Sequence, residues 1–305
     1  MKISFVNLVI FLVLFFSCGE EKNKQAATYG KLSFGADEGI QYIAASEASL
    51  FSYFYKESSV TPIFGKETQL VEDFINNKFP LILCYRDFTK EEKQLLKERS
   101  VIPYSTVIGL EGLALITAKN NPDSAISVKD LKCILTGKGD SLAALQKKWK
   151  NLVFDGTGTG NFRFIDSMIR HQPLSPYCFT KKTPEECIDF VSKNPGTIGI
   201  VSFGLLADKN DLRVKETRKK IKILSVSEDG KNYFVPAQQS FFNFDYPLMR
   251  KIYMHSRDAD GSLAMGFISY VSSEEGQLVI KQGGLMPARL AWNNMHLVFE
   301  PMKIK

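Results

Sequence analysis

Short apolar runs alternate with amphipathic segments along most of this chain after residue 29. The runs at 31–35, 61–64 and 81–84 have the length and composition of strands. Between them, apolar residues recur every three or four positions over 42–56 and 70–79, which is the period of a helix. This order of strands and helices predicts an α/β fold with mainly parallel strands. Ligands of such sheets bind beyond the carboxyl ends of the strands.

The second half of the chain continues this pattern and then turns back. We expect a strand at 113–117, a crossing into a second lobe, and a return through 233–244. Beyond the return, the pattern predicts a strand at 251–254 and one long helix at 266–282. The two crossings give lobe 1, residues 29–115 and 243–305, and lobe 2, residues 116–242. Two crossings predict a hinge and a cleft between the lobes.

A loop of glycines and threonines follows the apolar run at 152–154 and precedes a helical pattern. A strand that turns into a helix in this way leaves backbone N–H groups at the positive end of the helix dipole. We therefore predict an anion site at Gly156, Thr157, Gly158 and Thr159. A tight turn that binds nothing is the alternative. The loop lacks both the Lys-Ser/Thr ending of a P-loop and the spacing of a dinucleotide-binding motif, which disfavours nucleotide chemistry.

The first 17 residues have the features of an export signal. Lys2 precedes an apolar run that ends at residue 16 and is shorter than a bilayer-spanning helix. Ser17 and Cys18 follow, and this cysteine resembles the lipid-modified cysteine of a bacterial lipobox. We predict a signal peptide at 1–17, lipidation of Cys18 and a polar tether at 18–28. The chain would then be a membrane-anchored lipoprotein of the cell envelope that faces the periplasm, with plain secretion as the alternative.

Composition removes several functional classes. The formal net charge is +6, and the densest basic run, at 213–222, lacks interleaved aromatic residues. We therefore expect a solvated loop or helix end there, and no nucleic-acid partner. The scattered histidines predict neither a metal site nor a cofactor. No nucleophile elbow or histidine accompanies the acidic residues, so we expect no catalytic residues and no enzyme.

The cysteines after Cys18 fall into two groups. Cys84 and Cys133 lie in apolar contexts and are expected to be buried small hydrophobic residues. Cys178 and Cys187 could pair in an oxidising envelope or remain free, and the sequence does not decide between these states.

Four segments, taken in order, resemble the PstS-type phosphate-binding receptors of ABC importers. Residues 131–138 are similar to the Leu-x-x-Ile-Phe-x-Gly segment of that family, and 155–159 to its Asp-Gly-Ser-Gly-Thr loop. Residues 194–199 resemble its Asn-Pro-Gly-Ala-Ile-Gly turn, and 246–287 its closing segment. The resemblance implies the two-lobed type II periplasmic-binding-protein fold, often called a venus flytrap. It also implies a monomer that binds inorganic phosphate or a similar oxyanion and delivers it to ABC importer permease subunits.

The resemblance implies that loop N–H groups and hydroxyls of both lobes hold the oxyanion, with the glycine loop as the contribution of lobe 2. The family usually has an arginine where this chain has Val153, and Arg163 or Arg86 could replace its charge. The positions implied on lobe 1 lie at three strand ends: Asp37, Glu38, Gly39, Glu67, Thr68, Tyr85 and Arg86.

Acidic residues are unusual beside an anion. Hydrogen phosphate carries a proton that needs an acceptor and sulfate carries none, so one carboxylate could select phosphate. Several unpaired carboxylates would repel any anion. We expect one or two of Asp37, Glu38, Glu67 and Asp87 to face the cleft, paired with Arg86, and the rest to be exposed. The alternatives are that all four are surface charges, or that the chain is a receptor-like envelope lipoprotein that senses or scaffolds without phosphate transport.

Overall fold

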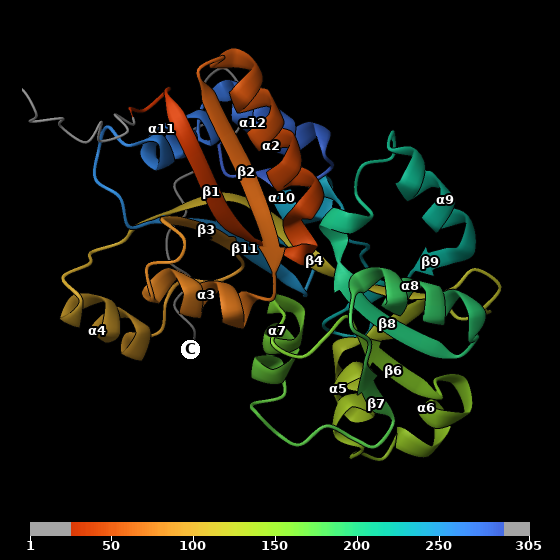
Figure 1. Ribbon diagram of the computed structural model, residues 1–305. Coiled ribbons are helices and arrows are strands. Elements are labelled where there is room, and N and C mark those ends of the chain that lie inside the picture. Colours follow the sequence, from red (N-terminus) through yellow and green to blue (C-terminus); the bar gives the residue numbers. More distant parts are fainter. Residues whose placement is uncertain (1–25, 290–305) are drawn as a thin grey trace, which may run out of the picture.

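The computed structural model describes residues 26–289, so the predicted signal peptide and Cys18 lie outside the described residues. Its main sheet has the strand order β2-β1-β3-β11-β4-β8-β6-β7, with β9 and β12 also paired to β4 (Figure 1). In that order the strands are β2 (Ser58–Gly65), β1 (Gly30–Asp37), β3 (Leu81–Cys84), β11 (Met249–Ser256), β4 (Tyr104–Ala118), β8 (Thr197–Ser202), β6 (Asn151–Phe154) and β7 (Cys178–Thr180). The short strands are β9 (Ile221–Ile223), β12 (Met286–Pro287), and the separate pair β5 (Ala125–Ser127) and β10 (Ser225–Ser227).

The long strand β4 joins two halves of this sheet. Residues Tyr104 to Gly112 pair with β11, and Leu113 to Ile116 pair with β8. We call β2, β1, β3 and β11 the first half, and β8, β6 and β7 the second half. Figure 1 shows the two halves on either side of β4. The lobe boundary predicted at 115/116 falls inside β4, and the one at 242/243 falls at the end of α10 (Gln238–Phe242).

Helices cover both halves of the sheet. The first half is accompanied by α2 (Gln41–Phe54), α3 (Glu67–Ile75), α4 (Lys90–Glu98), α11 (Leu263–Val271) and α12 (Glu274–Gln282). The second half is accompanied by α5 (Val128–Thr136), α6 (Leu142–Lys148), α7 (Gly160–Met168), α8 (Pro184–Lys193) and α9 (Leu212–Lys220). Short 3-10 turns follow β1 and β8 at Glu38–Ile40 and Phe203–Leu205. No described helix is long and apolar enough to span a bilayer.

Most predicted elements are confirmed, although the strand predicted at 113–117 is only the last part of the 15-residue strand β4. The expected parallel strands β1, β2 and β3 are adjacent, with β1 in the middle. Leu81–Cys84 is a strand with the predicted bounds, and both it and Thr197–Ser202 are fully buried. Both are apolar on both faces because helices or loops cover each side of the sheet.

The single long helix predicted at 266–282 is wrong. The structure has α11, then Ser272 and Ser273, and then α12. Ser273 is the N-cap residue of α12, and Glu274 and Glu275 occupy its first turn, where carboxylates favour the helix dipole. The Ser-Ser-Glu-Glu sequence is therefore the start of a second helix, although the spacing of the apolar residues predicts one continuous helix.

The predicted burial of Cys84 and Cys133 is confirmed, and all four described cysteines are free thiols. Cys178 lies on β7, while Cys187 lies on α8 and donates weakly to the Val153 carbonyl. The basic run at 213–222 forms nearly all of helix α9 and the start of β9, rather than the loop or helix end that was expected.

Candidate functional site

The loops at the ends of β1, β2 and β3 meet the start of α7, where the two halves of the sheet face each other. The predicted residues from both halves are therefore brought together in one place. Contacts between the halves include two hydrogen bonds from Thr68, whose N–H and Oγ1 lie 3.1 and 3.2 Å from the Gly158 carbonyl oxygen. Figure 1 shows α7 beside α3, which begins one residue before Thr68. We call the buried residues at this contact the inter-half site.

Asp37 lies at the centre of the inter-half site and accepts hydrogen bonds from both halves. The N–H of Gly39 donates to its Oδ1 over 2.8 Å, and the N–H of Gly160 donates to its Oδ2 over 3.4 Å. Gly160 is the first residue of α7, so the carboxyl group lies at the positive end of that helix dipole. A carboxyl group of the chain thus occupies the kind of position that an anion takes at a helix start.

Glu67 is fully buried and binds both arginines that were candidates for the charge missing at Val153. Arg163 donates from Nε to Glu67 Oε1, and from Nη2 to Oε2 over 3.3 Å. Arg86 Nε lies 3.4 Å from Glu67 Oε1, while its other guanidinium nitrogens bind Glu92 over 2.5 and 2.6 Å. The N–H of Tyr85 completes the set at 2.9 Å from Oε2. Val153 itself is buried in β6.

The threonines of the glycine loop have different roles. Thr157 is exposed. Thr159 is buried and caps α7, because its Oγ1 accepts from the N–H of Phe162 over 3.2 Å. Its hydroxyl lies 3.1 Å from Asp155 Oδ1, to which it can donate. Thr159 therefore supports the loop and the helix start, a role that the sequence pattern did not separate from anion binding.

Arg250 and Glu111 form a buried ion pair that the sequence analysis missed. The two residues are direct partners in the antiparallel pairing of β11 and β4. Arg250 donates from Nε and Nη2 to Glu111 Oε1 over 3.0 and 2.5 Å, and its guanidinium carbon lies 3.2 Å from the centre of the Tyr85 ring. Glu111 is the lone charge in the apolar strand β4, which was the available signal for a buried pair.

Ser202, at the end of β8, connects this ion pair to α7. Arg250 Nη2 donates to its Oγ over 2.7 Å, and Tyr85 donates from its hydroxyl over 3.0 Å. Ser202 in turn donates to Asn161 Oδ1 over 3.2 Å, and Asn161 donates to Asp155. This chain of hydrogen bonds extends from β11 in the first half to Asp155, the residue after β6, in the second.

The halves pack closely at this site. A β carbon at Gly39 would lie 2.0 Å from Ser202 Oγ, and one at Gly160 would lie 2.6 Å from a ring carbon of Tyr85. Only residues without a side chain allow these approaches. In the described conformation the two halves are therefore in close contact, while Arg250 Nη1 and Arg86 Nε are buried without a hydrogen-bond partner among the described residues.

Burial changes the charge of two carboxyl groups here. Loss of solvent, followed by the nearby Glu67, raises the pKa of Asp37 to about 8. Burial also raises the pKa of Asp155 to about 7, although hydrogen bonds from Asn161 and Thr159 oppose the change. At neutral pH Asp37 is therefore mostly protonated, and part of Asp155 is. These protons lower the negative charge that the four buried acids Asp37, Glu67, Glu111 and Asp155 would otherwise carry.

The expectation for the four loop acids, that one or two lie inside with Arg86 and the rest are exposed, is met only in part. Asp37 and Glu67 are buried, and Glu67 is paired with Arg86 as predicted. Asp87 is exposed and pairs with Lys93 over 2.7 Å. Glu38 is partly buried, and one of its carboxyl oxygens lacks a partner. The alternative in which all four acids are surface charges is wrong.

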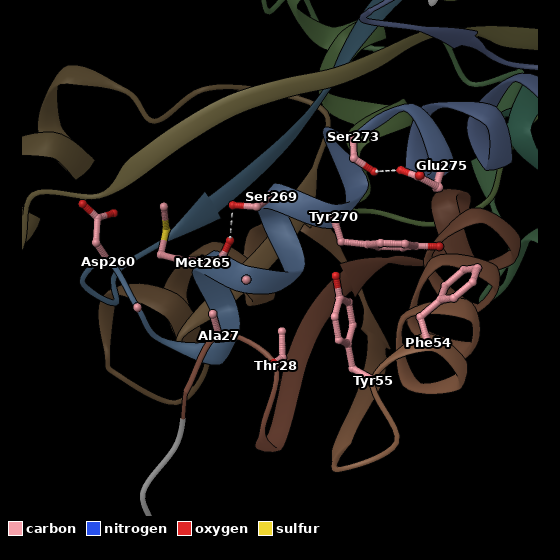
Figure 2. A pocket seen from close by; sticks show the side chains of 12 residues that line it. Ala27, Thr28, Phe54, Tyr55, Asp260, Met265, Ser269, Tyr270, Ser273 and Glu275 are labelled. Carbon is pink, nitrogen blue, oxygen red and sulfur yellow. Dashed lines mark hydrogen bonds between the residues drawn. The ribbon is translucent and has the colours of Figure 1, made fainter.

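A cavity of about 660 Å³ lies elsewhere, between α2, α11 and the residues before β1 (Figure 2). Figure 2 shows Phe54, Tyr55 and Tyr270 on one side of this cavity, and none of the predicted ligand-binding residues lines it. No group of three or more potential metal-ligating residues occurs within 26–289.

Comparison with known proteins identifies the fold. Residues 22–275 match the sequence profile of a family described as the PBP superfamily domain. Among proteins with curated functions, none matches the chain.

The solved structures that resemble this chain include receptors linked to phosphate transport. One is a protein of Clostridium perfringens, assigned as a substrate-binding protein of a phosphate ABC transporter and solved with bound phosphate. It has a TM-score of 0.69 and 19% identity, over 85% of this chain and 100% of that one. An ABC-type phosphate transport receptor from Vibrio cholerae has a TM-score of 0.64 and 16% identity, over 85% of this chain and 100% of that one. PstS from Borrelia burgdorferi has a TM-score of 0.53 and 19% identity, over 84% of this chain and 98% of that one.

Proposed function

Since this chain belongs to the PBP superfamily, whose mixed α/β fold is that of the type II periplasmic binding proteins, we propose that it is a solute receptor of the cell envelope. In this proposal it closes on phosphate or a related oxyanion at the inter-half site. It then presents the ligand to the permease subunits of an ABC importer. Binding proteins of this fold are typically not enzymes, and we propose no catalytic step.

The observation that carries this proposal is the position of Asp37. Amide groups of both halves point at its carboxyl oxygens, one of them from the first residue of α7. Phosphate presents oxygens of the same kind, and could take this position when the halves open. Positive charge would come from Arg163, Arg86 and Arg250. Protonation of Asp37 would remove a negative charge that repels the anion.

The same geometry supports a second candidate, a receptor-like envelope lipoprotein that senses or scaffolds without transporting phosphate. The hydrogen bonds that a ligand would make between the halves are already made by the chain, through Asp37, Thr68 and Glu67. A receptor that closes on its own carboxyl groups would not need a ligand to hold that conformation.

Calorimetric titration distinguishes the two candidates. The chain from Gly19 onward, unfolded and refolded to remove bound ligand, is titrated at pH 7 with phosphate and with sulfate. We expect saturable one-to-one binding of phosphate and none of sulfate, because only phosphate carries a proton that Glu67, the buried carboxylate paired with Arg163 and Arg86, can accept. Arg163→Gln should weaken phosphate binding about 30-fold, or ~2 kcal/mol, while the exposed Arg170→Gln should leave it unchanged. A folded protein that binds neither anion would reject the transport proposal in favour of the second candidate.

We also propose that Cys18 carries a lipid and anchors the protein to a membrane facing the periplasm. The apolar run before Ser17 and Cys18 supports this proposal. Cells that express Cys18→Ala should release the protein into the soluble envelope fraction, whereas wild type should sediment with membranes. Membrane retention of the variant at the wild-type level would contradict lipid anchoring.

A further inference from the structure

A second cavity, of about 600 Å³, lies near the connections between the two halves of the sheet and is lined by charged side chains. Its lining comes from the end of β4, from the segment before α9, from α9 and β9, from residues 235–239, and from the end of α12. Figure 1 shows α9 and β9 at the side of the structure, with β9 next to β4. None of the residues of the inter-half site lines this cavity. We call it the basic cavity.

Five basic side chains and one acidic side chain line the basic cavity: Lys119, Lys209, Arg218, Lys222, Lys281 and Asp208. Arg218 and Lys222 belong to the basic run at 213–222, which contributes no residue to the inter-half site. Among the described residues, no carboxylate lies within ion-pair distance of Lys119, Lys209, Arg218 or Lys222. Like charges in a concave site add their potentials and attract counter-ions.

The two half-buried cations of the basic cavity are held in place by carbonyl groups. Arg218 donates from Nε and Nη2 to the carbonyl of Leu206 over 2.9 and 2.6 Å, and Lys222 donates to the carbonyl of Asn121. Burial lowers the pKa of Arg218, because no anion offsets the lost solvation of its guanidinium group. The two side chains are thus positioned at the wall while their charge remains uncompensated.

We propose that the basic cavity binds a compact polyanion, a small molecule with two or more phosphate groups. Its volume lies within the range of ordinary small-molecule sites and exceeds what one phosphate ion fills. Cations contributed by several separate segments suit a ligand with more than one anionic group. The helix α12 accompanies the first half of the sheet and α9 the second half. A polyanion bound to both would therefore stabilise the present arrangement of the two halves.

Titration with inorganic diphosphate tests this proposal, in buffer that contains enough orthophosphate to saturate any inter-half binding. We expect saturable diphosphate binding that weakens as salt is raised. The double variant Lys119→Gln with Lys209→Gln should weaken it about tenfold, since two exposed ion pairs are each worth up to ~1 kcal/mol. Both lysines are exposed and make no described ion pair, so the thermal midpoint should stay at the wild-type value.

The matched control is Lys129→Gln with Lys147→Gln, which removes the same charge from exposed positions outside the basic cavity. It should change diphosphate affinity less than twofold. The proposal is overturned if wild type does not bind diphosphate, or if the control loses as much affinity as the cavity variant. Orthophosphate affinity measured alone should be equal in wild type and the cavity variant, so a failure here is distinct from a failure of the transport proposal.

Discussion

Replacing Arg250 with glutamine is expected to lower the free energy of unfolding by about 3–5 kcal/mol, because the change leaves the Glu111 carboxylate buried without its cation. Glu111 is fully buried, and its one other donor within residues 26–289 is the N–H of Gly204, over 3.0 Å. The substitution also removes the donor to Ser202 and the cation that lies over the Tyr85 ring. Urea unfolding followed by circular dichroism measures the loss.

The matched control is Lys193→Gln, which breaks an exposed ion pair with Asp189 on one face of α8. Its cost should stay near 0.5 kcal/mol, because solvent screens exposed pairs and both partners remain hydrated. If Arg250→Gln unfolds at the same urea concentration as this control, the buried pair contributes nothing net to stability. A double variant that also carries Glu111→Gln should recover part of the loss, since no unpaired charge then remains buried.

The parts of the fold that follow from local pattern could be predicted from the sequence. A fully apolar run of strand length identified β3, and the turn from β6 into α7 was found from its glycines. The break between α11 and α12 was missed because their apolar residues continue the same period across Ser272 and Ser273. Period alone does not distinguish one helix from two that pack end to end.

The site was predictable only in part, because its main contacts depend on strand register and on the approach of the two halves. The loops that carry Asp37, Glu67 and Thr159 were identified from the strand ends at which they lie. Glu111 and Arg250 are far apart in the chain, and their pairing follows from the antiparallel register of β4 and β11. Likewise, local sequence offers no sign that Asp37 accepts an N–H from Gly160 of the other half. Such contacts are set by tertiary packing.

Stability is expected to fall as the pH rises from 7 to 9, by on the order of 4 kcal/mol, because three buried carboxyl groups lose their protons in this range. Burial raises the pKa of Asp155 to about 7, of Asp37 to about 8 and of Glu47 to about 9. In the unfolded chain, carboxyl groups ionise near pH 4. The native state therefore holds more protons than the unfolded state at pH 7. The stability that they contribute is complete below about pH 4 and is lost as the pH passes the three native values.

Asp37→Asn tests this prediction at the inter-half site. Asparagine keeps the size of the side chain and cannot ionise, so the variant should lose about 1 kcal/mol less than wild type between pH 7 and pH 9. Burial lowers the pKa of His255, so this residue makes stability rise with pH, but only below the usual histidine pKa near 6.5. The range from pH 7 to pH 9 therefore excludes its effect. Urea unfolding at pH 7, 8 and 9 measures both proteins. Parallel stability curves for wild type and Asp37→Asn would mean that Asp37 stays ionised throughout, and an anion would then meet its full negative charge between the two halves.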